Sequence, residues 1–304
     1  MNTEKTSLSL KLNAILKLSR WRQHVPYTLP LVIAGALLAV SQADAVLDWR
    51  LLAVVIANIL AMTFAFMIND VVDAPDDALN PIKTKSNVIS QGLLSYQEGY
   101  WIAGAFFLLS AILFFFGGLW SFLAGLTTLI LSFAYSAPPL RLKSRPIVDV
   151  VSHVLMLSAL LMLSGYFAYD TNPNQAWWVI IAVTMASAYG QFYNQVDDFE
   201  TDKQAKLKNT AMLLGKQNTM FAMIFSAIVT LICFVIAITQ AVFPMWLGWV
   251  LGVTVFTVSL FSWDVDMRGN ETDASGVVQQ PVLVTANIVV FIWLLNELGL
   301  IGIA

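Results

Sequence analysis

Nine long apolar stretches run through this chain, and they decide what it can fold into. A helix that crosses a bilayer needs about 20 mostly apolar residues. Only 12% of the 304 residues are charged and 58% are hydrophobic, whereas soluble domains carry about 25% charged residues. The sequence therefore predicts an all-α polytopic membrane protein, with about nine transmembrane helices in a single bundle. The stretches cover residues 26–40, 51–68, 100–119, 119–135, 147–169, 177–193, 220–240, 245–263 and 281–303.

The rest of the composition excludes several kinds of partner and site. The net charge of −3 argues against nucleic acid as a partner, because polyanion binding needs a basic surface. Cys233 is the only cysteine of the chain, so an internal disulfide and the two-cysteine zinc patterns are excluded. His24 and His153 are the only histidines, which nearly excludes a metal site built from imidazoles.

The basic residues predict the topology. The first 22 residues hold five Lys or Arg with leucines between them, which indicates an interfacial amphipathic helix over residues 1–22 before a transmembrane domain of residues 23–304. If the N-terminus is cytoplasmic, all but one of the 16 Lys and Arg lie on that side, and Arg50 alone lies outside. By the positive-inside rule, the N-terminus and the active-site face are then cytoplasmic, in a bacterial inner membrane.

The motif Asn-x-x-x-Asp-x-x-x-Asp occurs twice, each time where an apolar stretch ends. Steps of four place the three side chains on one face of a helix. Pro75 is expected to break or kink the first helix, so that the last aspartate returns from a short turn. The copies comprise Asn69, Asp73 and Asp77, and Asn194, Asp198 and Asp202. A lysine and an asparagine follow each copy, as Lys83 and Asn87, and as Lys208 and Asn209.

Acidic residues at membrane helix ends often mark only the water boundary, but the duplication favours a function. Each carboxylate at a helix C-terminus is disfavoured by about 0.3–1 kcal/mol, and the cytoplasmic leaflet repels it as well. A hard divalent cation such as Mg²⁺ offsets this repulsion and is often shared with substrate phosphates. Neighbouring basic side chains can bind the phosphate oxygens. The expected phosphate ligands are Lys83, Arg141, Lys143 and Lys208.

These motifs resemble the two aspartate-rich motifs of the UbiA superfamily of intramembrane prenyltransferases. The loop Tyr-Ser-Ala-Pro-Pro-Leu-Arg-Leu-Lys at 135–143 resembles that family's tyrosine-and-basic segment. The run Asn-Val-Ile-Ser-Gln-Gly at 87–92 stands where many members have Arg-Pro-Ile-x-x-Gly, so that Asn87 replaces an arginine. The resemblance covers essentially the whole chain.

The resemblance implies Mg²⁺-dependent transfer of an isoprenyl chain from a prenyl diphosphate to a hydrophobic acceptor in the membrane. The acceptor could be aromatic, lipid or carotenoid-like. The implied metal ligands are Asp70, Asp73, Asp77, Asp198 and Asp202. The implied catalytic residues are Asp70, Asp73, Asp198, Asp202 and Tyr135. The implied substrate-binding residues are Asn69, Lys83, Asn87, Arg141, Lys143, Tyr193, Asn194 and Lys208.

Two other functions stay open from the sequence. A terpene cyclase of the same superfamily would release diphosphate from the donor without an acceptor. An ion-coupled transporter would carry its acids near the bilayer midplane, whereas these acids gather at one interface.

At the start of the fifth stretch, Asp149 and His153 are four residues apart. An aspartate at a helix N-terminus favours a structural role, and orientation or deprotonation of the acceptor is the alternative.

Overall fold

The computed structural model describes residues 8–43, 45–204, 206–260, 276 and 278–302, and within these residues every regular element is helical. In chain order the helices are α1 (Leu8–Leu18), α2 (Trp21–Gln42), α3 (Trp49–Asp77), α4 (Pro81–Ser86), α5 (Tyr96–Phe115), α6 (Leu119–Ser136), η1 (Leu142–Ser144), α7 (Val148–Val154), η2 (Leu155–Ala159), α8 (Leu160–Tyr166), η3 (Asn174–Ala176), α9 (Trp177–Asp197), α10 (Phe199–Gln204), α11 (Thr210–Leu214), α12 (Lys216–Thr239), α13 (Met245–Leu260) and α14 (Gln279–Glu297).

The described part of each predicted apolar stretch is mostly helical, but the count of nine spans is not confirmed; residues 261–263 and 303 of the last two stretches lie outside the described residues. In the described part of the chain, seven helical segments are long and apolar enough to cross a membrane: α2, α3, α5, α6, α7 to α8, α12 and α14. Helix α13 has only 16 residues. Helix α9 has 21 residues, but Ser187, Gln191 and Asn194 on it line an interior cavity and lower its hydropathy. The chain is an all-α, multi-pass membrane protein.

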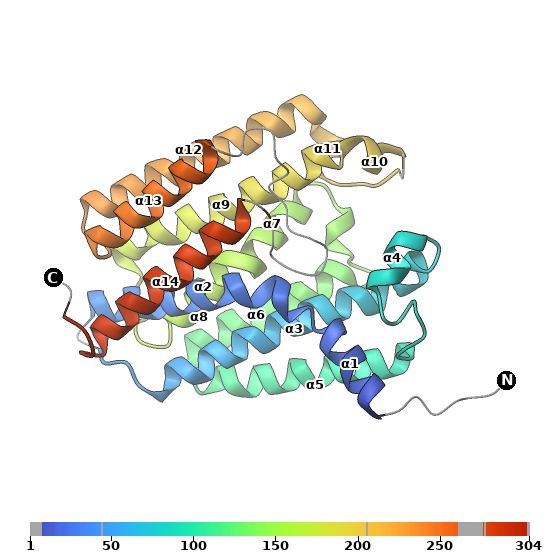
Figure 1. Cartoon of the computed structure of the whole chain (residues 1–304), viewed down its shortest axis with the longest axis horizontal. Helices are drawn as coiled ribbons and strands as arrows, with labels where there is room; N and C mark the ends of the chain where they lie inside the picture. The colour runs from blue at the N-terminus through green and yellow to red at the C-terminus, as the bar shows by residue number, and fades with distance from the viewer. Residues whose placement is uncertain (1–7, 44, 205, 261–275, 277, 303–304) are drawn as a thin grey trace.

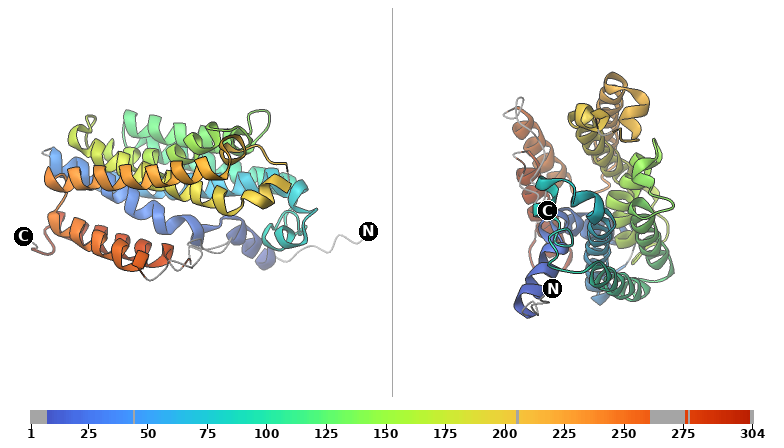
Figure 2. Two further views of the ribbon diagram at one scale, coloured as in Figure 1. Left: turned by 90° about the horizontal axis from the view of Figure 1, so that it is seen from above. Right: turned by 90° about the vertical axis from the view of Figure 1, so that its right-hand side faces the viewer.

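The helices run roughly along one axis, and both acid motifs lie at the same end of the bundle. Helices α3 and α9 end beside α4 and α10, and α1 lies at this end too (Figure 1). The C-terminal end of α14 lies at the opposite end (Figure 1). Helix α12 packs against α9, and α14 packs against α2 (Figure 2). The duplicated segments therefore lie at the same end of the molecule.

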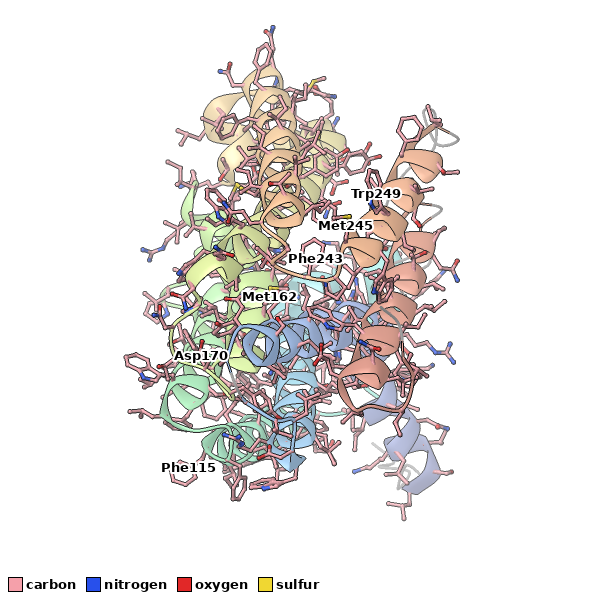
Figure 3. All side chains as sticks on the ribbon, turned by 90° about the vertical axis from the view of Figure 1, so that its left-hand side faces the viewer. Phe115, Met162, Asp170, Phe243, Met245 and Trp249 are labelled. Atoms are coloured by element: carbon pink, nitrogen blue, oxygen red, sulfur yellow. The ribbon has the colours of Figure 1, made fainter. Side chains whose placement is uncertain are left out.

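The outer surface of the bundle is apolar, as a lipid-facing surface must be. Seen from the end opposite the acid motifs, Met162 lies among the helices and Phe115 at the rim (Figure 3). Met162 is 1% exposed, whereas Phe115 is 69% exposed. Along the outer face of α12, Phe221, Phe225 and Leu231 are exposed as well. Apolar side chains thus cover both the interior and the exterior.

The acid motifs differ from the expected geometry in opposite ways. Helix α3 continues through Pro75 to Asp77, so the predicted break is wrong. Around Pro75 the side chains of Asn87 and Ser90 donate hydrogen bonds to the carbonyls of Asp70 and Ala74, at 2.7 and 2.8 Å. These bonds hold the helix on either side of the Val71 carbonyl, whose backbone donor the proline removes. The second motif, which contains no proline, is interrupted at Asp198 between α9 and α10.

Helices α2 and α8 approach so closely that only glycine fits at two positions. A Cβ on Gly35 would lie 2.1 Å from the Met162 carbonyl oxygen, and a Cβ on Gly165 would lie 2.1 Å from the Val32 carbonyl oxygen. Small residues allow membrane helices to pack backbone against backbone. The reciprocal contact fixes α8 against α2, and both helices line the interior cavity.

We expect Gly165→Ala to destabilise the fold by about 1–3 kcal/mol, the usual cost of overpacking. The measurement is the thermal unfolding temperature of the purified protein in detergent. Gly104→Ala is the matched control, because a Cβ on Gly104 of α5 meets nothing within 4 Å. Equal unfolding temperatures for the two variants would contradict the proposed tight crossing.

Candidate active site

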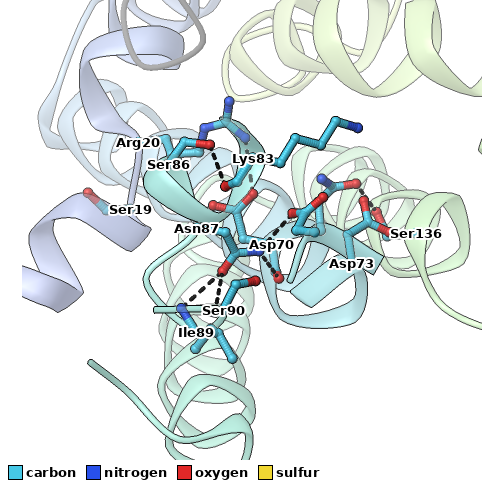
Figure 4. Close-up of polar contacts among 12 residues, drawn as sticks. Ser19, Arg20, Asp70, Asp73, Lys83, Ser86, Asn87, Ile89, Ser90 and Ser136 are labelled. Atoms are coloured by element: carbon cyan, nitrogen blue, oxygen red, sulfur yellow. Dashed lines mark hydrogen bonds and ion pairs between the residues drawn. The ribbon is translucent and has the colours of Figure 1, made fainter. Parts of the chain in front are cut away.

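The first acid motif lines a polar cavity of about 840 Å³ between α1, α3 and α4. Asn69, Asp70, Asp73 and Asp77 all contribute to its wall, because α3 continues as a helix to its end. Lys83 and Asn87 line the same cavity, and the Asn87 side chain donates a hydrogen bond to the backbone carbonyl of Asp70 (Figure 4). The predicted clustering of this motif with basic side chains is therefore present.

Each carboxylate of the motif has a cation or an amide as its partner. Asp70 is buried, and Arg20 donates to its Oδ1 at 3.0 Å. Asp73 accepts hydrogen bonds from Lys143 and, at 3.3 Å, from Arg141 Nη2. These ion pairs offset the repulsion between neighbouring acids.

Lys143 is the central cation of this end of the bundle. Its Nζ also donates to Asn69 Oδ1 at 2.9 Å, and the Ser136 hydroxyl donates to the same oxygen at 2.9 Å. Burial lowers the pKa of Lys143, although the negative charge of Asp73 acts in the opposite direction. Arg141 extends from the same loop to Asp76 Oδ2 at 3.2 Å. The loop after α6 thus places two cations on the first motif.

The duplication seen in the sequence extends to hydrogen bonds. Asn87 Nδ2 donates to Asp77 Oδ2 at 2.9 Å, and Asn209 Nδ2 donates to Asp202 Oδ2 at 2.7 Å. Each asparagine oxygen then accepts from a backbone N–H further along the chain, Ile89 and Ser90 in the first copy and Met212 in the second. The last aspartate of each motif is therefore oriented by the asparagine that follows it.

Lys83 acts electrostatically on the second motif. Burial raises the pKa of Asp202, and the charge of Asp198 adds to this effect, while the Asn209 hydrogen bond and the charge of Lys83 oppose it. The electrostatic effect of Lys83, which lines the cavity of the first motif, therefore reaches the second motif. Neither Asp198 nor Asp202 is among the described residues that line the polar cavity.

The donor set fits a magnesium ion that is completed by its substrate. Within the described ranges, no group of three or more His, Cys, Asp or Glu is close enough together to hold a metal ion alone. Mg²⁺ is usually bound by one or two carboxylates, with water and substrate phosphates as its other ligands. The carboxylates of Asp70, Asp73 and Asp77 in one cavity supply oxygen ligands of that kind.

An apolar cavity of about 730 Å³ lies inside the bundle, next to the polar one. Arg20 and Asn69 line both cavities, so the two spaces are neighbours that share these side chains. Tyr135 and Asn194, two of the predicted site residues, line the apolar cavity. A charged group at the polar end and a long chain in the apolar end could therefore belong to one molecule.

Two predicted substrate-binding residues lie away from these spaces. Lys208 is exposed on the loop between α10 and α11. Tyr193 stacks against Tyr189, with ring centroids 6.5 Å apart, and in the described part it is not among the residues that line either cavity. For both, substrate contact remains a prediction from the sequence.

The carboxylate of Asp149 is occupied by structural hydrogen bonds and is not open to a ligand. Its carboxylate accepts hydrogen bonds from the Thr210 hydroxyl, from the Thr210 N–H at 2.9 Å and from Gln195 Nε2 at 2.8 Å. Gln195 Oε1 in turn accepts from the Ala211 N–H at 3.0 Å. This buried network joins α7, α9 and α11, and holds the segment that follows the second motif.

Sequence reasoning missed Arg20 and the Gln195 network. Arg20 is one of five basic residues near the N-terminus, and nothing in their pattern distinguishes it from ordinary positive-inside charge. Its left-handed backbone, with φ of 47°, turns the chain between α1 and α2, and this turn brings its side chain to Asp70. Such a contact depends on tertiary structure alone.

Comparisons with known proteins point to one family. Residues 28–295 match the family model of the UbiA prenyltransferase family. A lycopene elongase/hydratase of Corynebacterium glutamicum is 26% identical over 75% of this chain and 77% of its own, and one of Haloarcula japonica is 30% identical over 66% of this chain and 68% of its own. The structure of a UbiA homologue from Archaeoglobus fulgidus, bound to GPP and Mg²⁺, has a TM-score of 0.71 and 21% identity, and covers 95% of this chain and 100% of its own. The chain therefore belongs to the UbiA prenyltransferase family.

Proposed function

We propose that this prenyltransferase transfers an isoprenyl chain from a prenyl diphosphate to a carotenoid-like acceptor, in a reaction that requires Mg²⁺. The proposal depends on one observation: a polar cavity with three carboxylates lies next to an apolar cavity and shares Arg20 and Asn69 with it. The diphosphate of the donor fits the first space and its hydrocarbon chain fits the second. Two relatives are named lycopene elongase/hydratase, which favours a polyene acceptor over an aromatic ring or a lipid headgroup.

In this proposal the basic side chains bind the diphosphate and the acids hold the metal. Mg²⁺, when bound, supplies Lewis-acid stabilisation of the charge that develops on the leaving diphosphate. Asp70, Asp73 and Asp77 of one motif, with Asp198 and Asp202 of the other, would hold it. Lys83, Arg141 and Lys143 donate hydrogen bonds to phosphate oxygens.

The apolar cavity protects the allylic cation that remains after the diphosphate leaves. Water would capture such a cation before the acceptor does, so the cavity must keep water away until the transfer is complete. Leu31, Met162 and Trp293 are among the apolar side chains of its wall. The ring of Tyr135 offers a π face to a cation in this cavity.

We also infer the position of the molecule in the bilayer. The acid-motif end, which carries the basic loops, faces the cytoplasm by the positive-inside rule. Helix α1 lies at this end, with Leu8, Leu12 and Leu16 exposed along one face. Such a face suits a helix lying in the interfacial region of the bilayer, next to the polar cavity that α1 helps to line.

The deciding experiment supplies membranes containing the protein with radiolabelled prenyl diphosphates of different lengths and with lycopene. We expect a lipophilic product whose mass equals the acceptor plus the prenyl group. Diphosphate release from the donor alone, with a cyclic hydrocarbon product, would instead support the terpene cyclase. Solute uptake that persists in the Asp73→Ala, Asp198→Ala double variant would support a transporter.

We expect Lys143→Met to lower kcat/KM for the donor by about 10–100-fold, because a hydrogen bond to a charged group contributes about 1.5–3 kcal/mol. The side chain of Lys143 is 18% exposed and pairs with Asp73, so water does not easily replace its ammonium. Lys216→Met is the matched control, since Lys216 is exposed at the start of α12. Equal kcat/KM values for the two variants would remove Lys143 from the diphosphate site.

We expect Asn209→Ser to weaken the apparent affinity for Mg²⁺ by about 10–100-fold, as loss of a partner behind a metal ligand does. Serine can still cap α11, which Asn209 does now by accepting from the Met212 N–H, but it is too short to keep the bond to Asp202. The measurement is the dependence of turnover on Mg²⁺ concentration. Asn218→Ser, at an exposed position where the amide meets only the Leu214 carbonyl, should leave this dependence unchanged. The assignment fails if both variants need the same Mg²⁺ concentration.

A further inference from the structure

His153 stands out among the polar side chains of the apolar cavity. Its imidazole lines the cavity next to Tyr135, with ring centroids 6.3 Å apart. Among the residues that the structure describes, the ring of His153 has no hydrogen-bond partner. A polar ring that faces an apolar space without a partner needs an explanation, because buried polar groups are usually satisfied.

The structure separates His153 from Asp149, its neighbour one turn away on α7. The carboxylate of Asp149 is fully engaged by Thr210 and Gln195. His153 lies four residues further along the helix, about 6 Å deeper in the bundle. Only the histidine of this pair therefore remains open to a ligand.

The backbone next to His153 is also unusual. The π-helical segment η2 begins at Leu155, one residue after α7 ends at Val154. Segments of this kind insert one extra residue and are frequent at functional sites. Met156, Leu157 and Ser158 of this segment line the same cavity as His153. The irregular turn thus belongs to the cavity wall.

We propose that His153 is the catalytic base of the apolar cavity, which takes the proton that prenyl transfer releases. This inference rests on the proposed function. When the C–O bond of the donor breaks, its electron pair stays on the diphosphate. The C–C bond then forms from the π electrons of the acceptor and leaves a cation on the acceptor. A C–H bond beside this cation breaks, its electrons form the new double bond, and the proton moves to the free imidazole nitrogen.

The same nitrogen also serves if water closes the reaction. In that case a C–O bond forms between water and the acceptor cation, and a proton of the water moves to the imidazole. A neutral imidazole has one unprotonated nitrogen, whereas the neighbouring Tyr135 has a phenol that keeps its proton near neutral pH. Histidine, not tyrosine, is therefore the base, and the ring returns its proton to water after product release.

The test uses the full-length protein in lipid nanodiscs, with prenyl diphosphate, Mg²⁺ and acceptor. His153→Gln and His153→Ala should lower kcat by about 10²–10⁴-fold, the usual contribution of a general base. The KM for the donor should stay within about twofold, because the diphosphate binds in the other cavity. Added imidazole should restore turnover of His153→Ala, but not that of His153→Gln, which leaves no space.

Isotopes identify the source of the proton. If the proton comes from carbon, an acceptor deuterated at that position gives a primary isotope effect and an alkene product. If it comes from water, the effect appears in deuterium oxide and the product is an alcohol. Either effect should increase in His153→Gln, because proton transfer then limits the rate. A purely structural role for His153 predicts neither the increase nor the rescue by imidazole.

The chain offers a matched control in its second histidine. His24 is buried outside both cavities and stacks on Phe66, so His24→Gln should retain kcat. Folded His153 variants with wild-type kcat, or a slow His153→Ala that imidazole does not rescue, would overturn the inference and leave the proposed function intact. If the wild-type protein makes no prenylated product, the proposed function fails, and His153 loses its role with it.

Discussion

Replacing Asp73 with asparagine is expected to reduce prenyl transfer by about 10³-fold or more while the protein stays folded. Removal of one preorganised charge or donor that faces a developing charge typically costs 10²–10³-fold in rate. Asp73 does more than this, because it is a predicted metal ligand and also positions Lys143 and Arg141. Its side chain is 18% exposed and faces a cavity, so its loss leaves no apolar void.

The measurement is product formation at saturating Mg²⁺ and donor, together with the thermal unfolding temperature. Asp198→Asn should reduce product formation to a similar extent, because both motifs are proposed to hold the same metal. Asp48→Asn is the matched control: Asp48 pairs with Arg50 at 2.9 Å on the exposed loop before α3, at the end remote from the motifs. Near wild-type turnover by Asp73→Asn and Asp198→Asn would exclude these carboxylates from the reaction.

The fold was largely predictable because membrane helices are determined by apolar length. The described part of each apolar stretch is mostly helical, and the two acid motifs lie at the same end of the bundle because both follow spans that end at that side. The number of spans was harder to predict, because the polar face of α9 points into a cavity and not into lipid. Hydropathy cannot distinguish a span with a polar interior face from a shorter interfacial helix.

The local geometry of the motifs could not be predicted in the same way. Pro75 is normally a helix breaker, but α3 continues through it while side chains from the following loop bond its carbonyls. The interruption at Asp198 has no signal in the sequence. Contacts between distant segments decided both outcomes, as they do when tertiary structure overrides local preference.

The site residues fall into the same two groups, those whose position follows from local spacing and those whose position depends on tertiary contacts. Spacing was enough to predict that Asn69, Asp73 and Asp77 share one wall, since helical periodicity fixes their face. The partners of these residues, such as Arg20 on Asp70, depend on how α1 turns into α2. One kind of partner was visible in the sequence repeat. The asparagine that follows each motif donates a hydrogen bond to the last aspartate of that motif.

Removal of Mg²⁺ by EDTA is expected to stop product formation, with a loss of about 10³-fold or more. Lewis-acid stabilisation of a leaving group contributes several kcal/mol, and about 4 kcal/mol corresponds to roughly 10³-fold in rate. The basic side chains alone cannot replace it, because Lys143 and Arg141 are held by Asp73 and Arg20 by Asp70. Added Mg²⁺ should restore the original rate.

A binding measurement separates the role of Mg²⁺ from that of the enzyme's own cations. In the described part of the chain no three acidic, histidine or cysteine side chains form a ready-made metal site, so Mg²⁺ alone should change the unfolding temperature little. Mg²⁺ together with diphosphate should raise it, because a ligand that binds only the folded state stabilises that state. Asp73→Asn should lose this increase and Asp48→Asn should keep it. Full turnover in EDTA, or an increase with diphosphate alone, would mean that lysine and arginine bind the leaving group without a metal.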